Sequence, residues 1–201
     1  MATLAVVGGK VTADLFNQLV NEVNSIGLIG MKPTSVSGSG VTVDAVGMVT
    51  FTSATTVIVD GCFTSSFRNY RVVCEATGTA GNHLVNLRAG GSNDTSAYDR
   101  TENLARNATV SSATTLNASN WAVVGVANTL VQWDMEISAP QLAVATTGLS
   151  RGGSHSNPAV SNFSNVLALN YLTHRTASVY DGLRVTISAA QSGTLRVYGY
   201  N

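Results

Sequence analysis

The sequence predicts an all-β protein, a jelly-roll-like β-sandwich, with one short α-helix near its N-terminus. Runs in which apolar and polar residues alternate recur from residue 41 to the C-terminus, and turns rich in glycine or serine separate them. Almost no helical periodicity follows Gly27. The 201 residues are enough for one sizeable core and too few for two ordinary domains with a linker. We therefore expect one main β domain with a small appendage.

The helix is expected to begin near Thr12 and to end at Gly27. Thr12 is a good N-cap, and Asp14 lies in the first turn, where a carboxylate suits the helix dipole. The apolar residues that follow are spaced by three, four and three, as in a coiled coil: Phe16, Leu19, Val23 and Ile26. Because a helix of about fourteen residues is marginal alone in water, this stripe must pack either on the β domain or on the same helix of other copies.

The chain divides into three predicted segments. Residues 1–30 contain the helix, residues 31–40 form a linker of proline, glycine and serine, and residues 41–201 form the β domain. The short apolar run at the N-terminus has no basic residue ahead of it, and no apolar stretch approaches the length that spans a bilayer. We predict neither a signal peptide nor a membrane span.

Two predicted hairpins form the expected centre of the sandwich. The first covers residues 57–73 with a turn at Asp60-Gly61, and the second covers residues 183–200 with a turn at residues 191–193. A terminus so rich in aromatic and β-branched residues is expected to lie in the sheet rather than fray. Shorter strands are expected at residues 41–44, 48–52, 83–87, 110–116, 121–126, 131–137 and 166–171.

The charge pattern argues against a nucleic-acid partner. Only 11% of the residues are charged and the formal net charge is zero. The chain has two lysines, Lys10 and Lys32, and its arginines are scattered rather than clustered as in nucleic-acid binders. A net charge near zero gives little self-repulsion, which suits a protein in a fixed assembly. Cys62 and Cys74 are expected to be free buried thiols, although a bridge between neighbouring strands is conceivable.

Two polar, glycine-rich loops are the candidate recognition surfaces. They are expected at residues 89–98 and 147–158, and loops of this kind on a rigid sheet often bind ligands. Saccharides are recognised by aromatic faces and by hydrogen bonds from Asn, Asp and Arg. Either loop could equally be a tolerant surface turn, and Tyr98 a rim residue of the core. The candidate receptor-binding residues are Asn93, Asp94, Tyr98, Arg151, His155 and Asn157.

No catalytic residues, metal ligands or cofactors are predicted. Asp134 and Glu136 share one face of a strand, which raises the possibility of a glycosidase pair. They alternate with apolar residues, however, as expected on the solvated side of a half-buried strand. The three histidines, His83, His155 and His174, have no metal-ligand spacing around them, and no Gly-x-Ser-x-Gly elbow occurs.

Several stretches resemble a family of bacteriophage tail proteins, the C-terminal head domains of small tail-fibre, minor tail or receptor-binding proteins, especially in phages of actinobacteria. The resemblance covers roughly residues 55–201 and rests on residues 61–73, 87–98, 180–182 and 192–200. Residues 12–20 also resemble the family's virion-proximal helix. The resemblance implies a homotrimer with a stem formed by Phe16, Leu19, Val23 and Ile26. It further implies a β domain that faces outward from the virion. Together with the two polar loops, it leads us to expect binding to a host cell-surface glycan, while the charge and apolar patterns predict no nucleic-acid partner and no membrane insertion.

The chain departs from that family in one respect that leaves alternatives open. Receptor-binding proteins often carry a separate anchoring module, whereas only about forty residues precede the β domain here. A capsid decoration or head-fibre protein without a specific receptor remains an alternative, and a glycan-degrading tail enzyme is a less favoured one. In each case the protein is expected on the phage particle after assembly in the host cytoplasm.

Overall fold

The computed structural model describes residues 27–106, 109–124, 130–155 and 165–201, and within these ranges the protein is all-β, as predicted. The predicted stem residues lie outside the described ranges. No helix in those ranges is long and apolar enough to cross a membrane. The strands are β1 (Ile29–Gly30), β2 (Ser35–Ser37), β3 (Val41–Val43), β4 (Val49–Asp60), β5 (Asn69–Gly78), β6 (His83–Ala89), β7 (Ser92–Asn93), β8 (Tyr98–Arg106), β9 (Thr109–Ala118), β10 (Trp121–Val124), β11 (Leu130–Ser138), β12 (Thr146–His155), β13 (Asn165–His174) and β14 (Gly182–Tyr200).

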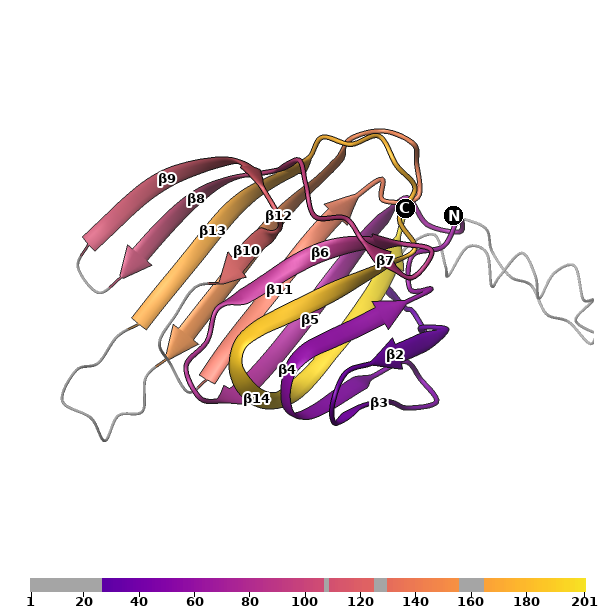
Figure 1. The fold of residues 1–201 in the computed structure, drawn as a ribbon, viewed down its shortest axis with the longest axis horizontal. Coiled ribbons are helices and arrows are strands. Elements are labelled where there is room, and N and C mark those ends of the chain that lie inside the picture. The colour runs from indigo at the N-terminus through magenta and orange to yellow at the C-terminus, as the bar shows by residue number, and fades with distance from the viewer. Residues whose placement is uncertain (1–26, 107–108, 125–129, 156–164) are drawn as a thin grey trace, which may run out of the picture.

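The strands form one continuous antiparallel sheet that folds over itself (Figure 1). Its main path runs β10-β6-β14-β5-β11-β12-β13-β8-β9, and β4 lies on the other side of β14 together with β2 and β3. Strand β10 contacts β12, β11, β13 and β8 although it is hydrogen-bonded only to β6 within the described ranges. The β6–β10 end of the sheet therefore covers one face of the β11–β13 region, and the core lies between these two layers.

Strand β14, a single strand of 19 residues, connects the two layers of the fold. Its first part, 182–187, pairs with β6, and its second part, 191–200, pairs with β5. Strand β4 follows β14 along its other edge through both parts, with a shift in register between Thr186 and Gln191. The strand visibly bends over at this point (Figure 1). This bend carries the sheet from one layer to the other.

Both predicted central hairpins are wrong, for the same reason. Residues 191–193 do not form a turn, because β14 continues through them. A side chain at Gly193 would overlap the carbonyl oxygen of Glu75 on β5, so this glycine allows two strands to approach closely. Strands β4 and β5 likewise do not pair with each other, since each lies along a different edge of β14. Gly61, at a φ of 67°, ends β4, and the chain then crosses to β5.

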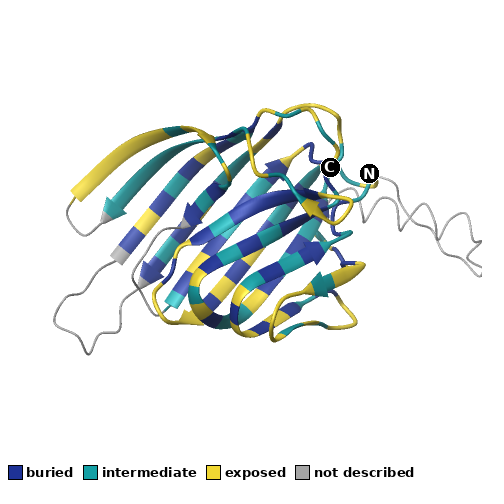
Figure 2. Cartoon of the chain, in the orientation of Figure 1, coloured by how far each residue is buried: buried dark blue, intermediate teal, exposed yellow. Residues whose placement is uncertain are grey.

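Alternating burial along the strands separates a core face from an outer face (Figure 2). On β11 the inward residues Trp133, Met135 and Ile137 are buried, while Gln132 is exposed. Strand β9 is different, because nearly all of its residues are exposed and it ends the sheet. The two cysteines are buried free thiols, and burial raises the pKa of both.

A buried chain of hydrogen bonds ties the two layers together. The indole N–H of Trp133 on β11 donates to Nδ1 of His83 on β6 over 2.9 Å. That fixes the tautomer, so Nε2–H of His83 donates to Oε1 of Gln191 on β14 over 2.8 Å. Gln191 in turn donates to the carbonyl of Thr79 over 2.7 Å. These buried hydrogen bonds therefore hold β11, β6 and β14 together.

Candidate functional site

Three residues of the first predicted recognition loop, Asn93, Asp94 and Tyr98, are engaged by the interior, whereas residues 89–92, 95 and 96 are exposed. Tyr98 is the first residue of β8 and is fully buried, so its side chain belongs to the core. Its hydroxyl accepts a hydrogen bond of 2.8 Å from the backbone N–H of Leu87. Asn93 accepts a hydrogen bond from the guanidinium of Arg88, whose side chain is itself 7% exposed. These contacts fix the β6–β8 connection.

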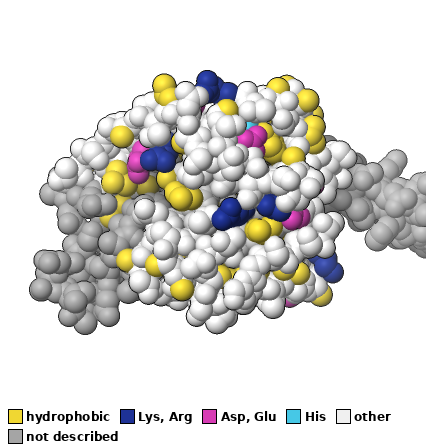
Figure 3. Space-filling model, viewed as in Figure 1, with side chains coloured by type: hydrophobic (Ala, Val, Ile, Leu, Met, Phe, Trp, Pro, Cys, Tyr) yellow, Lys and Arg dark blue, Asp and Glu magenta, His cyan; other side chains and the backbone are white. Residues whose placement is uncertain are grey.

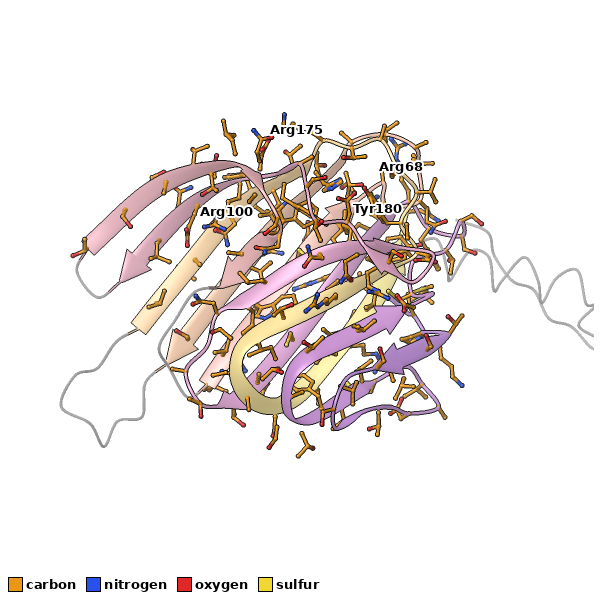
Figure 4. All side chains as sticks on the ribbon, viewed as in Figure 1. Arg68, Arg100, Arg175 and Tyr180 are labelled. Carbon is orange, nitrogen blue, oxygen red and sulfur yellow. The ribbon has the colours of Figure 1, made fainter. Side chains whose placement is uncertain are left out.

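Asp94 is likewise engaged by the interior. The hydroxyl of Tyr180 donates to its carboxylate over 2.9 Å, and Nε2 of His174 lies 3.3 Å from the same oxygen (Tyr180 is labelled in Figure 4). Partial burial of the carboxylate opposes ionisation, but the hydrogen bonds from Tyr180 and from the backbone of Ser96, with the charge of His174, lower the pKa of Asp94 overall. Asp94, in the turn before β8, therefore holds the loop that contains Tyr180 in place.

The second predicted loop is mostly a strand. Residues 146–155 form β12, which pairs with β11 on one side and β13 on the other. Its glycine-rich composition predicts a loop, but Gly148 is packed between two strands: a Cβ there would lie 2.9 Å from the carbonyl oxygen of Glu136 and 3.5 Å from the side chain of Leu172. Arg151 lies in the middle of this strand, His155 is its last residue, and Asn157 lies outside the described ranges. Of the predicted residues that the structure describes, Arg151 lines the groove described next.

The outer face of β5, β11, β12 and β13 contains a groove of about 380 Å³. The registers place Glu75, Gln132, Gly153 and Leu167 in one row across these four strands. Because Gly153 has no side chain, the row has a gap about 10 Å wide, two strand spacings, between Gln132 and Leu167. The groove is lined by Arg71, Val73, Cys74, Glu75, Gln132, Trp133, Asp134, Arg151, Gly152, Gly153 and Leu167.

A network of charged side chains forms one wall of this groove. Asp134 faces Arg151 directly across the β11–β12 pair. Its carboxylate lies 2.9 Å from the guanidinium of Arg151 and 3.2 Å from that of Arg71 on β5. Arg151 also pairs with Glu136 over 2.9 Å. The hydrogen bond that Arg151 donates to Asp134, followed by the negative charge of Asp134, raises the pKa of Arg151. Both arginines are therefore held in place before any ligand arrives.

The apolar side chain of Leu167 forms the other wall, and exposed apolar surface continues beyond the groove along β13. Leu167 is 61% exposed and Tyr171 is 59% exposed, and both point outward on the same strand face. They lie about 13 Å apart, four strand residues. Val73 is a further exposed apolar residue of the groove. The combination of a rigid polar wall with exposed apolar and aromatic surface is typical of sites for amphipathic ligands such as sugars.

The groove residues that the sequence did not reveal are of ordinary polar and charged types. What brings them together is the pairing register of distant strands. Alternation along β11 placed Gln132, Asp134 and Glu136 on a solvated face. Nothing local indicated that Arg71 and Glu75, far earlier in the chain, would lie beside them. The view in Figure 3 shows basic and acidic side chains in small mixed groups separated by uncharged surface. Among the residues that the structure describes, no three histidine, cysteine or acidic side chains are grouped so as to hold a metal ion.

Comparisons with known proteins give little further guidance. No family model and no curated protein matches the chain. One similar solved structure is the CBM2 module of the evolved Dit of Lactobacillus casei BL23 phage J-1, with 9% sequence identity and a TM-score of 0.28. The match covers 88% of this chain and 99% of that one. At this level of similarity it assigns neither a fold nor a function to the chain.

Proposed function

We propose that this chain is a bacteriophage virion protein whose β domain binds a host cell-surface glycan through the groove on β5, β11, β12 and β13. The observation that carries the proposal is the gap at Gly153, which opens a groove of about 380 Å³ between a charged wall and an apolar one. The motifs that resemble phage tail proteins support the virion assignment. Three of them, residues 61–73, 87–98 and 192–200, contribute to β5, β6 and β14.

The chemistry of the groove suits a sugar. A pyranose presents hydroxyl groups at its edge and C–H groups on its face, so it needs hydrogen-bond acceptors and donors beside an apolar surface. Asp134, Glu75 and Gln132 supply the polar groups, and Leu167 with Tyr171 supplies the apolar surface. Because the charged groups already hold one another, ligand binding requires little ordering of side chains.

The proposed role is binding rather than catalysis. Asp134 and Glu136 are both paired with one arginine, Arg151, and lie on the open face of a strand. A glycosidase of the usual kind needs two carboxyl groups on opposite sides of the scissile bond. Two acids that share one cation on one strand face do not supply that arrangement.

The proposal includes a homotrimer joined by the N-terminal segment. Its basis is the a/d spacing of Phe16, Leu19, Val23 and Ile26 together with the resemblance to the virion-proximal helix. The double variant Leu19→Asp and Val23→Asp tests it by light scattering. A fall in mass from three copies to one supports the trimeric stem, and an unchanged mass contradicts it.

A second candidate is a capsid decoration or head-fibre protein without a specific receptor. It is favoured by β9, a strand of ten residues with an unpaired edge in the described sheet and no charged residue. Such an edge suits lateral packing between subunits. Electron microscopy of labelled particles separates the two candidates, because the first places the protein on the tail and the second on the capsid lattice.

The groove is tested by filling it. The ideal Cβ position at Gly153 has one neighbouring atom, 3.6 Å away, so a larger residue there fits without moving the sheet. Gly153→Trp is expected to abolish adsorption of the purified protein to host cells while leaving the melting temperature within a few degrees. The matched control is Ser37→Trp, which adds the same side chain at an exposed position on β2. Equal adsorption of both variants would overturn the proposed site.

A further inference from the structure

We infer that the groove selects uncharged, hydroxyl-rich saccharides and rejects anionic polymers, an inference that rests on the proposed glycan-binding function. Surface glycans of bacteria include neutral sugars and polymers that carry phosphate or carboxylate groups, so the distinction defines the class of receptor. It depends on the charges of the groove and on which of them are free.

The groove lining has no net positive charge. Two guanidinium groups, Arg71 and Arg151, and two carboxylates, Glu75 and Asp134, line it. Glu136, which shares Arg151 with Asp134, adds a third carboxylate at its edge. An anionic ligand therefore meets balanced charges in the groove and one further carboxylate beside it, which disfavours binding and slows association.

The two positive charges are also already paired. Asp134 bridges both guanidinium groups, at 2.9 Å from Arg151 and 3.2 Å from Arg71. The same Nη2 of Arg151 lies 2.9 Å from Glu136. Other N–H groups of these arginines remain donors, but a phosphate or carboxylate that reached them would lie beside the carboxylates that the fold holds opposite them. Such an anion gains little, because each cation is already neutralised and the neighbouring carboxylates repel it.

The groove also has free capacity for accepting hydrogen bonds from hydroxyl groups. Glu75 is exposed, and its Oε2 accepts a hydrogen bond of 3.0 Å from the side-chain amide of Gln132. A carboxylate has about four acceptor positions, so Glu75 can accept further bonds from a sugar. Hydrogen bonds from neutral donors to a carboxylate are stronger than those between neutral groups. Glu75 and Gln132 lie in the same row as the gap at Gly153.

The apolar wall is consistent with an uncharged ligand. Leu167 is Gly153's neighbour across the β12–β13 pair, and Tyr171 continues the exposed apolar surface along β13. A charged group placed against this wall would lose hydration without gaining a partner. The C–H face of a neutral sugar loses nothing there, and the wall is long enough for more than one sugar unit.

A glycan array that presents neutral oligosaccharides beside lipoteichoic acid and oligogalacturonate tests the inference. We expect the full chain to bind neutral glycans and neither anionic probe, with a dissociation constant that changes less than roughly twofold between low and high salt. Gly153→Trp should lose that binding. Binding to an anionic probe that falls with salt and is lost in Gly153→Trp would keep the proposed function and overturn this inference. Binding to no glycan, or binding that Gly153→Trp does not affect, would overturn both.

A charge variant provides an independent check. Glu75→Gln keeps the size of the side chain and an oxygen that accepts from Gln132, but removes the charge. We expect affinity for the bound neutral glycan to fall about tenfold or more, because charge-assisted hydrogen bonds are lost. The matched control is Glu102→Gln on β8, which should leave affinity unchanged. A gain of neutral-glycan affinity in Glu75→Gln would contradict the inference.

Discussion

Arg151 on β12 faces Asp134 on β11 across the sheet, with 2.9 Å between the guanidinium and the carboxylate. Each residue has a second partner, Glu136 for Arg151 and Arg71 for Asp134, so the pair is the centre of a network on the outer face. The network lies outside the core, so its contribution to stability can be separated from its proposed contribution to binding.

The variant Arg151→Met measures that separation. The arginine side chain is 45% exposed, and exposed ion pairs contribute about 1 kcal/mol or less to the free energy of unfolding. Urea unfolding should therefore show a loss below about 1 kcal/mol, whereas glycan affinity should fall because Asp134 and Glu136 lose their common partner. A loss of several kcal/mol on unfolding with unchanged affinity would reverse these assignments.

The free energy of unfolding should fall as the pH drops from 7 towards 5. Burial lowers the pKa of His83 in the folded protein, although its hydrogen bond to Gln191 opposes the shift. Below the ordinary histidine pKa, about 6.5, the unfolded chain therefore binds a proton at His83 that the folded chain does not bind. Stability is lost in that pH range. Asp94 acts at lower pH, since its lowered pKa gives stability that is lost only as its carboxylate becomes protonated.

NMR of the imidazole nitrogens against pH checks the assignment to His83. The folded protein should keep Nδ1 unprotonated, as acceptor from Trp133, and Nε2 protonated through the range in which free histidine titrates. A His83 resonance that titrates in the folded state near 6.5 would contradict the prediction. Thermal unfolding at pH 7 and pH 5 gives the corresponding change in stability.

Gly193 should tolerate no side chain, whereas Gly153 should. A Cβ at Gly193 would overlap the carbonyl oxygen of Glu75 and crowd the ring of Phe51, both in well-packed strands. Gly193→Ala should therefore cost about 3 kcal/mol or more. Gly153→Ala is the matched control and should change the free energy of unfolding by less than about 0.5 kcal/mol. Chemical denaturation of the two variants measures both values, and similar costs would show that the sheet relaxes at residue 193.

The ion pair between Arg88 and Asp60 should contribute far more than the exposed pairs. Arg88 is nearly buried, and its Nε and Nη2 lie 2.7 and 3.2 Å from the two carboxylate oxygens of Asp60. Asp60→Ala leaves this guanidinium buried without its counter-ion, which costs about 3 to 5 kcal/mol. Glu102→Ala, which removes a partner 3.9 Å from Arg100, should cost less than about 1 kcal/mol. Equal losses in the two variants would mean that burial does not decide the difference.

The sequence by itself determined the all-β class and the two faces of strands with clear alternation, such as β11. Trp133, Met135 and Ile137 point into the core and Gln132 points out, as the alternation of apolar and polar residues predicts. Side chains on successive strand residues point to opposite faces, so local order in the chain is enough to assign them. The all-β class follows from repeated patterns of this kind.

Only the tertiary structure decided which strands are neighbours and where the groove lies. The pairing of β14 with β4 joins opposite ends of the chain, and no local pattern distinguishes a long bent strand from a hairpin at Gln191 and Gly193. The glycines of β12 favour a loop by composition, yet the strands on both sides hold them extended. Strand pairing depends on packing between distant segments, and therefore the row that places Gly153 between Gln132 and Leu167 exists only in the folded sheet.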